Sequence, residues 1–470
     1  MKQRILRLLA LAAALPLAVA LAGCAGPGPD AGVTQAPYTP QPAEAAAPSA
    51  EAAAPSAEPA APSAEAPAEA AAPSDDWWAD AGALTAKDVH ARATSGDGAV
   101  RLLAVNVGKG DALVLRAGDY VCLIDAGRNY SLGRVTEALA MMGVSEADGK
   151  TRLDAAFLTH TDGDHAGGLA GLARGFGAHP ELRVDNWYAP AMYTGVKAEK
   201  HPAAVAAGAC GQAVNWLERG DVIPLGDTGA ALRVLAPAHL FTDKDDNNSL
   251  VMMLESPQGK ILFTGDMELP EEADLLSFGD DLKCDVLKVP NHGDDDTTGE
   301  VFARAAGARL AVISTDSAEK ASTPDPGVVA RLQAAGSRVV VTQQAEMGLL
   351  VTLAGGEVTV EDVGIERPEV SGLSIAEVDA GDDRIVLRND SGAPVDLTGF
   401  ALVSDPGSEM YVFAGRRIDP GATLTVGTRS TEGECDVLWD DKKVIHRKKT
   451  DTIRLYDGFS RLVDEMDNGL

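Results

Sequence analysis

The chain is poor in aromatic residues, basic residues and cysteine. Only 4% of its 470 residues are aromatic, and 40 Lys and Arg stand against 70 Asp and Glu, for a formal net charge of −30. The segments 25–80, 81–368 and 369–470 are each net acidic, so bulk charge does not support electrostatic capture of nucleic acid. No apolar run after residue 24 approaches 18 residues, which excludes a polytopic membrane protein.

The five cysteines show no CxxC spacing, which disfavours a thiolate zinc site. Cys122 lies in the apolar run Val121–Ile124 and is expected in a buried strand. The sequence leaves open whether any of the others form a disulfide.

Residues 1–24 have the composition of an export signal. Three basic residues precede the apolar stretch Leu8–Ala22, which is short for a membrane span. The stretch ends in Leu21-Ala22-Gly23-Cys24, which resembles the lipobox of bacterial lipoproteins. The resemblance implies a signal peptide, lipidation of Cys24 and an extracytoplasmic protein held to the membrane lipid of a bacterial cell. An ordinary cleaved signal or a short uncleaved anchor is the alternative.

Residues 25–80 are dominated by Ala, Pro, Ser and Glu. The pentapeptide Ala-Pro-Ser-Ala-Glu recurs at 47–51, 54–58 and 61–65, and its prolines interrupt any helix. Such a segment cannot bury a core, so we expect a disordered, solvated linker.

Residues 81–366 alternate short β-rich runs with helical patterns, which favours a layered α/β domain. Strands are expected at 101–107, 112–116, 120–124, 155–159, 231–235, 250–255, 260–264, 286–289, 310–313, 339–342 and 349–353, and helices at 133–142, 271–276, 299–306 and 326–335.

The stretch from Thr159 to Gly168 concentrates residues that bind metals. It places His160, Asp162, Asp164 and His165 within six positions, directly after an expected buried strand. Oxygen and imidazole ligands at this density suit Zn²⁺, Mn²⁺ or Fe. A polar surface loop is the bland alternative. Three later pieces fit the same site: 264–266 and 291–293 end expected strands, and 247–249 opens another.

Together these motifs resemble the metallo-β-lactamase fold superfamily, and within it the hydrolase domain of the ComEC competence-protein branch. The matching segments are VGKGDA (107–112), IDAG (124–127), HTDGDHAGG (160–168), NNSLV (247–251), FTGD (263–266) and NHG (291–293). The resemblance implies an αββα sandwich with one or two divalent metal ions, Zn or Mn.

Carried over residue by residue, the resemblance implies that His160 and Asp162 hold a first metal. Asp164, His165 and His292 would hold a second, with Asp266 bridging the two. A metal-bound hydroxide would be the nucleophile. Asp164 would also orient that water or act as general base, and Asn247 or Asn248 would position substrate or fill a ligand place.

Departures from the branch make hydrolysis of DNA a weaker expectation than metal binding. Asn291 and Asp294 stand where the branch commonly has His and Ser, and Thr323-Pro324 stands where it commonly has His-Pro. Three carboxylates, Asp294–Asp296, would repel a polyanion or attract cations, or are simply a solvated charge run.

The last stretch, residues 368–470, reads as short strands separated by turns, which favours an all-β, immunoglobulin-like sandwich. Segments such as IVLRN (385–389), VDLTGF (395–400) and LYD (455–457) resemble the lamin-tail domain. The resemblance implies a role in binding a surface or polymer. Its basic cluster, Lys442, Lys443, Arg447, Lys448 and Lys449, is either a solvated hairpin or a polyanion contact.

The sequence therefore predicts a surface-anchored metal-dependent hydrolase that acts on phosphodiesters such as extracellular DNA. Two alternatives stay open. One is a metallohydrolase for a small ester, lactone or phosphonate, which the acidity of the chain favours. The other is a non-catalytic binding lipoprotein, against which the six ligand positions argue.

Overall fold

The computed structural model describes residues 83–145, 148–174, 183–366, 368–404 and 409–470. The expected signal peptide, Cys24 and the linker lie outside the described residues. No described helix is both long and apolar enough to cross a membrane. Two folded domains follow, and each is considered by itself.

The first domain is built on two β-sheets. The first sheet has the strand order β17-β16-β1-β2-β3-β5-β7-β8, and the second has the order β15-β14-β13-β12-β11-β10-β9. The strands of the first sheet are β1 (Val100–Val105), β2 (Ala112–Ala117), β3 (Tyr120–Ala126), β5 (Ala155–Phe157), β7 (Trp187–Pro190), β8 (Val214–Leu217), β16 (Gly348–Ala354) and β17 (Glu357–Val363). Those of the second are β9 (Val222–Pro224), β10 (Ala231–Ala236), β11 (Val251–Ser256), β12 (Gly259–Phe263), β13 (Val286–Lys288), β14 (Leu310–Ile313) and β15 (Arg338–Val341).

Alternation of apolar side chains explains why the two sheets pack face to face. In β3, Cys122 and Ile124 enter the core between the sheets, whereas Val121 and Leu123 enter the core under the outer helices. In β12, Ile261 and Phe263 face the first sheet. Because both faces of each sheet are buried, these strands read as nearly continuous apolar runs. The expected burial of Cys122 is confirmed.

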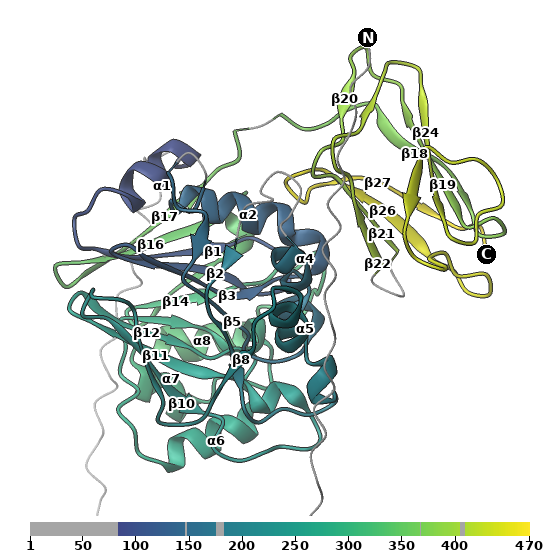
Figure 1. Ribbon diagram of the computed structural model, residues 1–470. Helices are drawn as coiled ribbons and strands as arrows, with labels where there is room; N and C mark the ends of the chain where they lie inside the picture. The colour runs from purple at the N-terminus through teal and green to yellow at the C-terminus, as the bar shows by residue number, and fades with distance from the viewer. Residues whose placement is uncertain (1–82, 146–147, 175–182, 367, 405–408) are drawn as a thin grey trace, which may run out of the picture. The chain divides into compact units, whose positions relative to one another are not determined.

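Helices cover the outer face of each sheet (Figure 1). Those on the first sheet are α1 (Ala86–Ala93), α2 (Leu132–Met141), α4 (Leu169–Arg174) and α5 (Pro202–Ala209), and those on the second are α6 (Leu269–Ser277), α7 (Glu300–Ala306) and α8 (Pro326–Ala334). The remaining short elements are α3 (Gly163–Ala166), the two-stranded pair β4 (Arg152–Leu153) and β6 (Arg183–Val184), and the 3₁₀ turns η2 (Asn129–Ser131), η3 (Ala198–Lys200), η4 (Asp245–Asn248), η5 (Pro290–Gly293) and η6 (Thr342–Gln344). The predicted αββα sandwich is confirmed.

The second domain is the predicted all-β sandwich. One four-stranded sheet has the order β18-β19-β24-β25 and the other β22-β21-β26-β27, with β20 paired to β23. Their bounds are β18 (Leu373–Asp379), β19 (Arg384–Asn389), β20 (Val395–Asp396), β21 (Ala401–Ser404), β22 (Glu409–Val412), β23 (Arg417–Ile418), β24 (Thr423–Thr428), β25 (Val437–Trp439), β26 (Thr452–Tyr456) and β27 (Leu462–Asp467). Leu387 and Val426 from one sheet share a core with Leu402 and Leu455 from the other.

Candidate metal centre

The predicted ligands come together where strands of the two sheets end. His160 and Asp162 follow β5, and Asp164 and His165 lie on the short helix α3 directly after them. Asp266 follows β12, and η5 with its histidine follows β13. Because β12 and β13 are parallel neighbours, their carboxyl ends lie at one edge of the second sheet.

One group of potential ligands consists of Asp164, His165 and His292, whose ligand atoms all lie within 4.8 Å of one another. The two imidazole Nε2 atoms are 3.3 Å apart, and Asp164 Oδ2 is 3.6 Å from the Nε2 of His292. His292 reaches this position from a strained turn, since Asn291 and His292 have φ values of 40° and 54°. Such a backbone conformation costs free energy for a non-glycine residue, and residues that adopt it cluster at functional sites.

A hydrogen-bond partner fixes each of these two rings. Nδ1 of His165 lies 2.8 Å from Asp125 Oδ2, and Asp125 itself accepts hydrogen bonds from the backbone N–H and the hydroxyl of Thr159. Nδ1 of His292 lies 2.8 Å from the carbonyl oxygen of Ser314, to which it donates. With Nδ1 as the donor, Nε2 of the neutral ring is free to bind a metal, which is the arrangement of metal-binding histidines.

A second group consists of His160, Asp162 and Asp246. Asp246 Oδ1 lies 4.0 Å from the Nε2 of His160. Asp246 belongs to η4, far along the chain from the other two, and the sequence did not single it out. The sequence signal that could have identified Asp246 is its position directly before Asn247 and Asn248, which belong to a matching motif.

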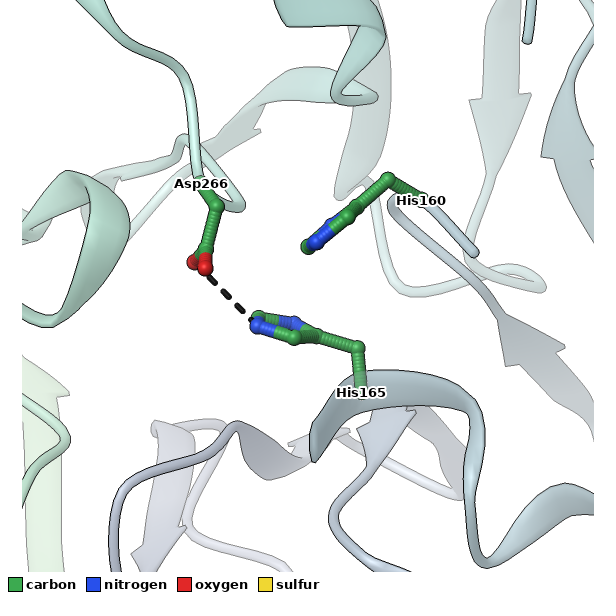
Figure 2. Close-up of side chains that lie close together, drawn as sticks. All are labelled: His160, His165 and Asp266. Carbon is green, nitrogen blue, oxygen red and sulfur yellow. Dashed lines mark ion pairs between the residues drawn. The ribbon is translucent and has the colours of Figure 1, made fainter. Parts of the chain in front are cut away.

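Asp266 lies beside both groups. Its Oδ1 is 3.2 Å from the Nε2 of His165, and its Oδ2 is 3.0 Å from the Nε2 of His292. Figure 2 shows the Asp266 carboxylate and the rings of His160 and His165 pointing toward one another, and the three ligand atoms meet the same 4.8 Å limit. This is the position that a bridging ligand requires.

The protonation of these side chains reflects their mutual contact. Burial alone would lower the pKa of His165, but the carboxylates of Asp266 and Asp125 raise it well above its usual range. Burial alone would raise the pKa of Asp266, but the imidazoles of His165 and His292 lower it well below its usual range. A bound cation would replace the proton in holding the carboxylate and imidazoles together.

The chemistry of the donor set fits a divalent metal. The buried Nε2 of His160 has no hydrogen-bond partner among the described residues. The Asp266 carboxylate contacts the imidazoles of His165 and His292. Imidazole nitrogens and carboxylate oxygens are the ligands of Zn²⁺, Mn²⁺ and Fe. These residues can therefore hold one or two divalent ions.

Close backbone approach explains two glycines of the motifs. A Cβ on Gly110 would lie 2.6 Å from the Asp164 carbonyl oxygen, and one on Gly168 would lie 2.3 Å from that of Ala126. Only glycine permits these contacts. They hold α3 and its two ligands against the loop before β2 and the end of β3.

A buried ion pair lies under the centre, and the sequence did not predict it. Lys288 Nζ is 2.7 Å from Asp111 Oδ2, and both side chains are 1% exposed. Asp111 Oδ1 is in turn 3.7 Å from the Nδ1 of His292. The sequence signal for this ion pair is that Lys288 is a charged residue inside an apolar strand.

The two asparagines proposed for substrate positioning support the η4 loop. Asn248 Oδ1 accepts from the backbone N–H of Phe241 and its Nδ2 donates to the carbonyl of Phe241, both at 2.8 Å. Asn247 Nδ2 donates to Glu268 Oε2 at 2.9 Å. The structure thus places both amides in contacts that shape the loop carrying Asp246, and Asn248 as a catalytic group stays a prediction.

The acidic run after His292 is partly neutralised. Asp294 forms an ion pair with Lys320, and Asp296 Oδ1 accepts from Asn291 Nδ2 at 3.3 Å. Asp295 is exposed. Two of the three carboxylates therefore have structural partners.

Each of the two domains matches a known protein family. The Metallo-beta-lactamase superfamily matches residues 105–317, and the Lamin Tail Domain matches residues 366–469. ComE operon protein 3 of Bacillus subtilis is 30% identical over 198 residues, 42% of this chain and 24% of that protein. Competence protein ComA of Neisseria gonorrhoeae is 26% identical over 243 residues, 50% of this chain and 30% of that protein. The match thus spans under a third of the length of either relative.

Among solved structures, the metallo-beta-lactamase fold protein YhfI of Bacillus subtilis is 14% identical, with a TM-score of 0.35 over 54% of this chain and 99% of that one. The sequence matches and the αββα architecture agree on the first domain, and the strand-rich second domain agrees with its own match. Residues 105–317 therefore match the metallo-beta-lactamase superfamily and have an αββα fold, and residues 366–469 match the lamin tail domain.

Proposed function

We propose that the first domain hydrolyses phosphodiesters, with nucleic acid such as extracellular DNA as its substrate, and that it uses two divalent ions, Zn or Mn. The observation that carries this proposal is the pair of adjacent ligand groups with Asp266 beside both. Two-metal sites of this kind are typical of phosphatases and nucleases. When bound, such ions lower the pKa of coordinated water and stabilise the charge that develops on phosphoryl oxygens.

Asp164 is suited to orient the attacking water. Burial alone would raise the pKa of its carboxyl, but His165, His292 and Lys109 lower it below its usual range. Asp164 therefore stays ionised at neutral pH and can accept a hydrogen bond from water. Its side chain is 12% exposed, so water can reach it.

Two cations at the same place favour a phosphate substrate. Lys109 Nζ lies 3.0 Å and Arg128 Nη2 3.7 Å from Asp164 Oδ2. Arg128 also lies 3.8 Å from Glu319. In so acidic a chain, a lysine and an arginine beside the ligand groups supply the local positive charge that a phosphodiester needs.

The names of the relatives support nucleic acid as the substrate. Besides the two competence-related proteins, Recombination protein 2 of Haemophilus influenzae is 25% identical over 229 residues, 48% of this chain and 26% of that protein. Recombination is a process of DNA. The proposal extends this association to the chain through the shared domain alone.

We further propose that the chain is anchored to the outside of the bacterial membrane through a lipid on Cys24. The lipobox at residues 21–24 supports this proposal. Metabolic labelling with a radioactive fatty acid should label the wild-type chain in cells and not a Cys24→Ser variant. Equal labelling of both would exclude this anchor.

The lamin tail domain would supply contact with a surface or polymer. Its basic cluster is exposed, with Lys442, Lys443, Arg447, Lys448 and Lys449 all on the surface. Replacing the five with Gln should weaken retention on an anionic polymer column. Unchanged retention would leave the cluster as a solvated loop.

The experiment for the hydrolase proposal combines metal analysis with an activity assay. The purified chain is supplied with Mn²⁺ or Zn²⁺, and its metal content and its cleavage of a DNA strand are compared with a His160→Ala, Asp266→Ala double variant. We expect bound metal and metal-dependent cleavage in the wild type and neither in the variant. Bound metal without cleavage would redirect the search to small esters, lactones and phosphonates, and absence of bound metal would exclude the hydrolase.

A further inference from the structure

Three aromatic rings gather in the first domain beside the candidate metal centre. They belong to Tyr193, which follows β7, to His201, which precedes α5, and to Trp216 in β8. The rings of Tyr193 and Trp216 are stacked, with centroids 5.3 Å apart and an angle of 25° between their planes. In a chain with 4% aromatic residues, this aromatic cluster is a marked concentration.

The cluster is open on one side and filled on the other. The Trp216 side chain is 38% exposed, whereas Trp187 and Trp439, the other described tryptophans, are 1% and 4% exposed. His201 is fully buried and meets the edges of both rings, with centroids 4.5 Å from Tyr193 and 4.9 Å from Trp216. Tyr193 and Trp216 thus form a surface that a fixed third ring supports.

Burying His201 costs more free energy than burying an apolar ring would. Neither of its ring nitrogens has a hydrogen-bond partner within the described part of the chain. Burial lowers its pKa to about 4, an effect that Asp245 opposes, so the ring is neutral at pH 7. Phenylalanine would support the two rings without leaving polar atoms unpaired.

One carboxylate connects the cluster to the ligand group of His160, Asp162 and Asp246. Asp245 Oδ1 accepts from the backbone N–H of Thr194 at 2.6 Å. Its Oδ2 accepts from the backbone N–H of Thr161 at 3.0 Å and from the Thr161 hydroxyl at 2.6 Å. Thr194 follows Tyr193, and Asp245 precedes Asp246. Two chain steps of about 3.8 Å and one hydrogen bond therefore connect Tyr193 to a metal-ligand candidate.

We infer that Tyr193 and Trp216 form a stacking surface for an unpaired base of single-stranded nucleic acid, whose phosphodiester then lies at the ligand groups. This inference rests on the proposed function and narrows its substrate. Stacking on aromatic rings contributes about 1–3 kcal/mol per base and tolerates any base. A duplex, whose bases are already stacked, would not satisfy it.

The test compares two strands that differ only in their bases. One is a ten-nucleotide thymidine strand, and the other is a stable abasic deoxyribose-phosphate strand of the same length. Binding to the inactive His160→Ala, Asp266→Ala chain is measured by fluorescence anisotropy and by quenching of tryptophan emission. We expect the thymidine strand to bind roughly tenfold more tightly than the abasic strand and to quench the emission.

The Trp216→Ala substitution should remove this preference and leave binding of the abasic strand unchanged. Trp216→Phe should restore most of it, because a ring is restored, and this second variant guards against a folding defect. Phe278→Ala is the matched control: Phe278 is 42% exposed and follows α6, at the end opposite to Glu268. It should bind both strands like the parent chain.

Equal binding of the two strands, or no effect of Trp216→Ala, would overturn the inference. Cleavage separates that failure from failure of the proposed function. If the wild-type chain cuts both strands at the same metal-dependent rate, the hydrolase proposal holds and the stacking inference fails. If it cuts neither strand and still prefers the thymidine strand, the stacking inference holds and the hydrolase proposal fails.

Discussion

Asp266 in the first domain and Asp383 in the lamin tail domain are both buried carboxylates, 4% and 1% exposed. Asp383 Oδ1 accepts from the backbone N–H of Ile445 at 2.7 Å, and its Oδ2 accepts from that of Val444 at 3.0 Å and from the hydroxyl of Thr428 at 2.6 Å. Hydrogen-bond donors surround its charged oxygens, so Asp383 connects the loop that carries the basic cluster to the end of β24. Such a carboxylate is structural.

Asp266 has the opposite surroundings. Its carboxylate contacts the Nε2 atoms of His165 and His292, and another partner orients each of these rings through Nδ1. Equal burial thus hides different roles. The donors around a buried carboxylate, and not its burial, distinguish a structural residue from a metal-ligand candidate.

The largest expected effect is that of Asp266→Asn. A metal that binds only the folded chain stabilises it by about 4 kcal/mol at a concentration a thousandfold above Kd. Thermal unfolding with and without Mn²⁺ should show this gain in the wild type. The variant should lose it, because it lacks the ligand next to both groups. An undiminished gain in the variant would place the metal elsewhere.

Asp383→Asn should lower the stability of its domain and not affect metal binding. The amide presents N–H groups where the carboxylate accepts hydrogen bonds from four donors, so the lamin tail domain should lose about 2–4 kcal/mol of unfolding free energy. Urea unfolding followed by tryptophan fluorescence checks this, since Trp439 lies in the core of that domain. Metal binding should be unchanged. A variant as stable as the wild type would contradict the structural role.

Asp125→Asn sharpens the comparison, because Asp125 is a carboxylate that acts through a ligand. It accepts from Thr159 and holds Nδ1 of His165. Loss of such a partner usually lowers metal affinity by about 10–100-fold. Competition with a chelator should show this drop with unchanged stoichiometry. Affinity equal to that of the wild type would mean that His165 does not need its partner.

His201 extends the comparison to a buried base. Its pKa is lowered to about 4 from an ordinary value of 6.5. The unfolded chain therefore takes up this proton below pH 6.5 and the folded chain only near pH 4, so the unfolding free energy falls as the pH drops through that window. His201→Phe should remove about 2–3 kcal/mol of this fall. Denaturant unfolding at pH 7 and pH 4 measures it, and parallel pH curves would contradict it.

The sequence predicted the ligand group of Asp164, His165 and His292 better than that of His160, Asp162 and Asp246. Four candidates lie within six residues, so local spacing alone brings them together, and a strand end marks Asp266 and His292. Asp246 could not be chosen, because it stands among Asp243 and Asp245, which have the same chemistry. Only the three-dimensional contact with His160 selects it.

The helices show the same limit. The predictions for α2, α6, α7 and α8 rested on a mixture of apolar and polar positions. Helix α5, Pro202–Ala209, is apolar all round and carries no such pattern, so it was not predicted. The aromatic cluster next to it could not be predicted either, because Tyr193, His201 and Trp216 meet only when β7, α5 and β8 pack together.

Titration calorimetry of the metal-free chain with Mn²⁺ tests the central claim most directly, with Asp246→Asn as the comparison. The two ligand groups predict two ions per wild-type chain. They predict one per variant chain, because only the group of His160, Asp162 and Asp246 is damaged. A wild-type chain that binds no ion, or a variant that binds as many ions as the wild type, would contradict the account.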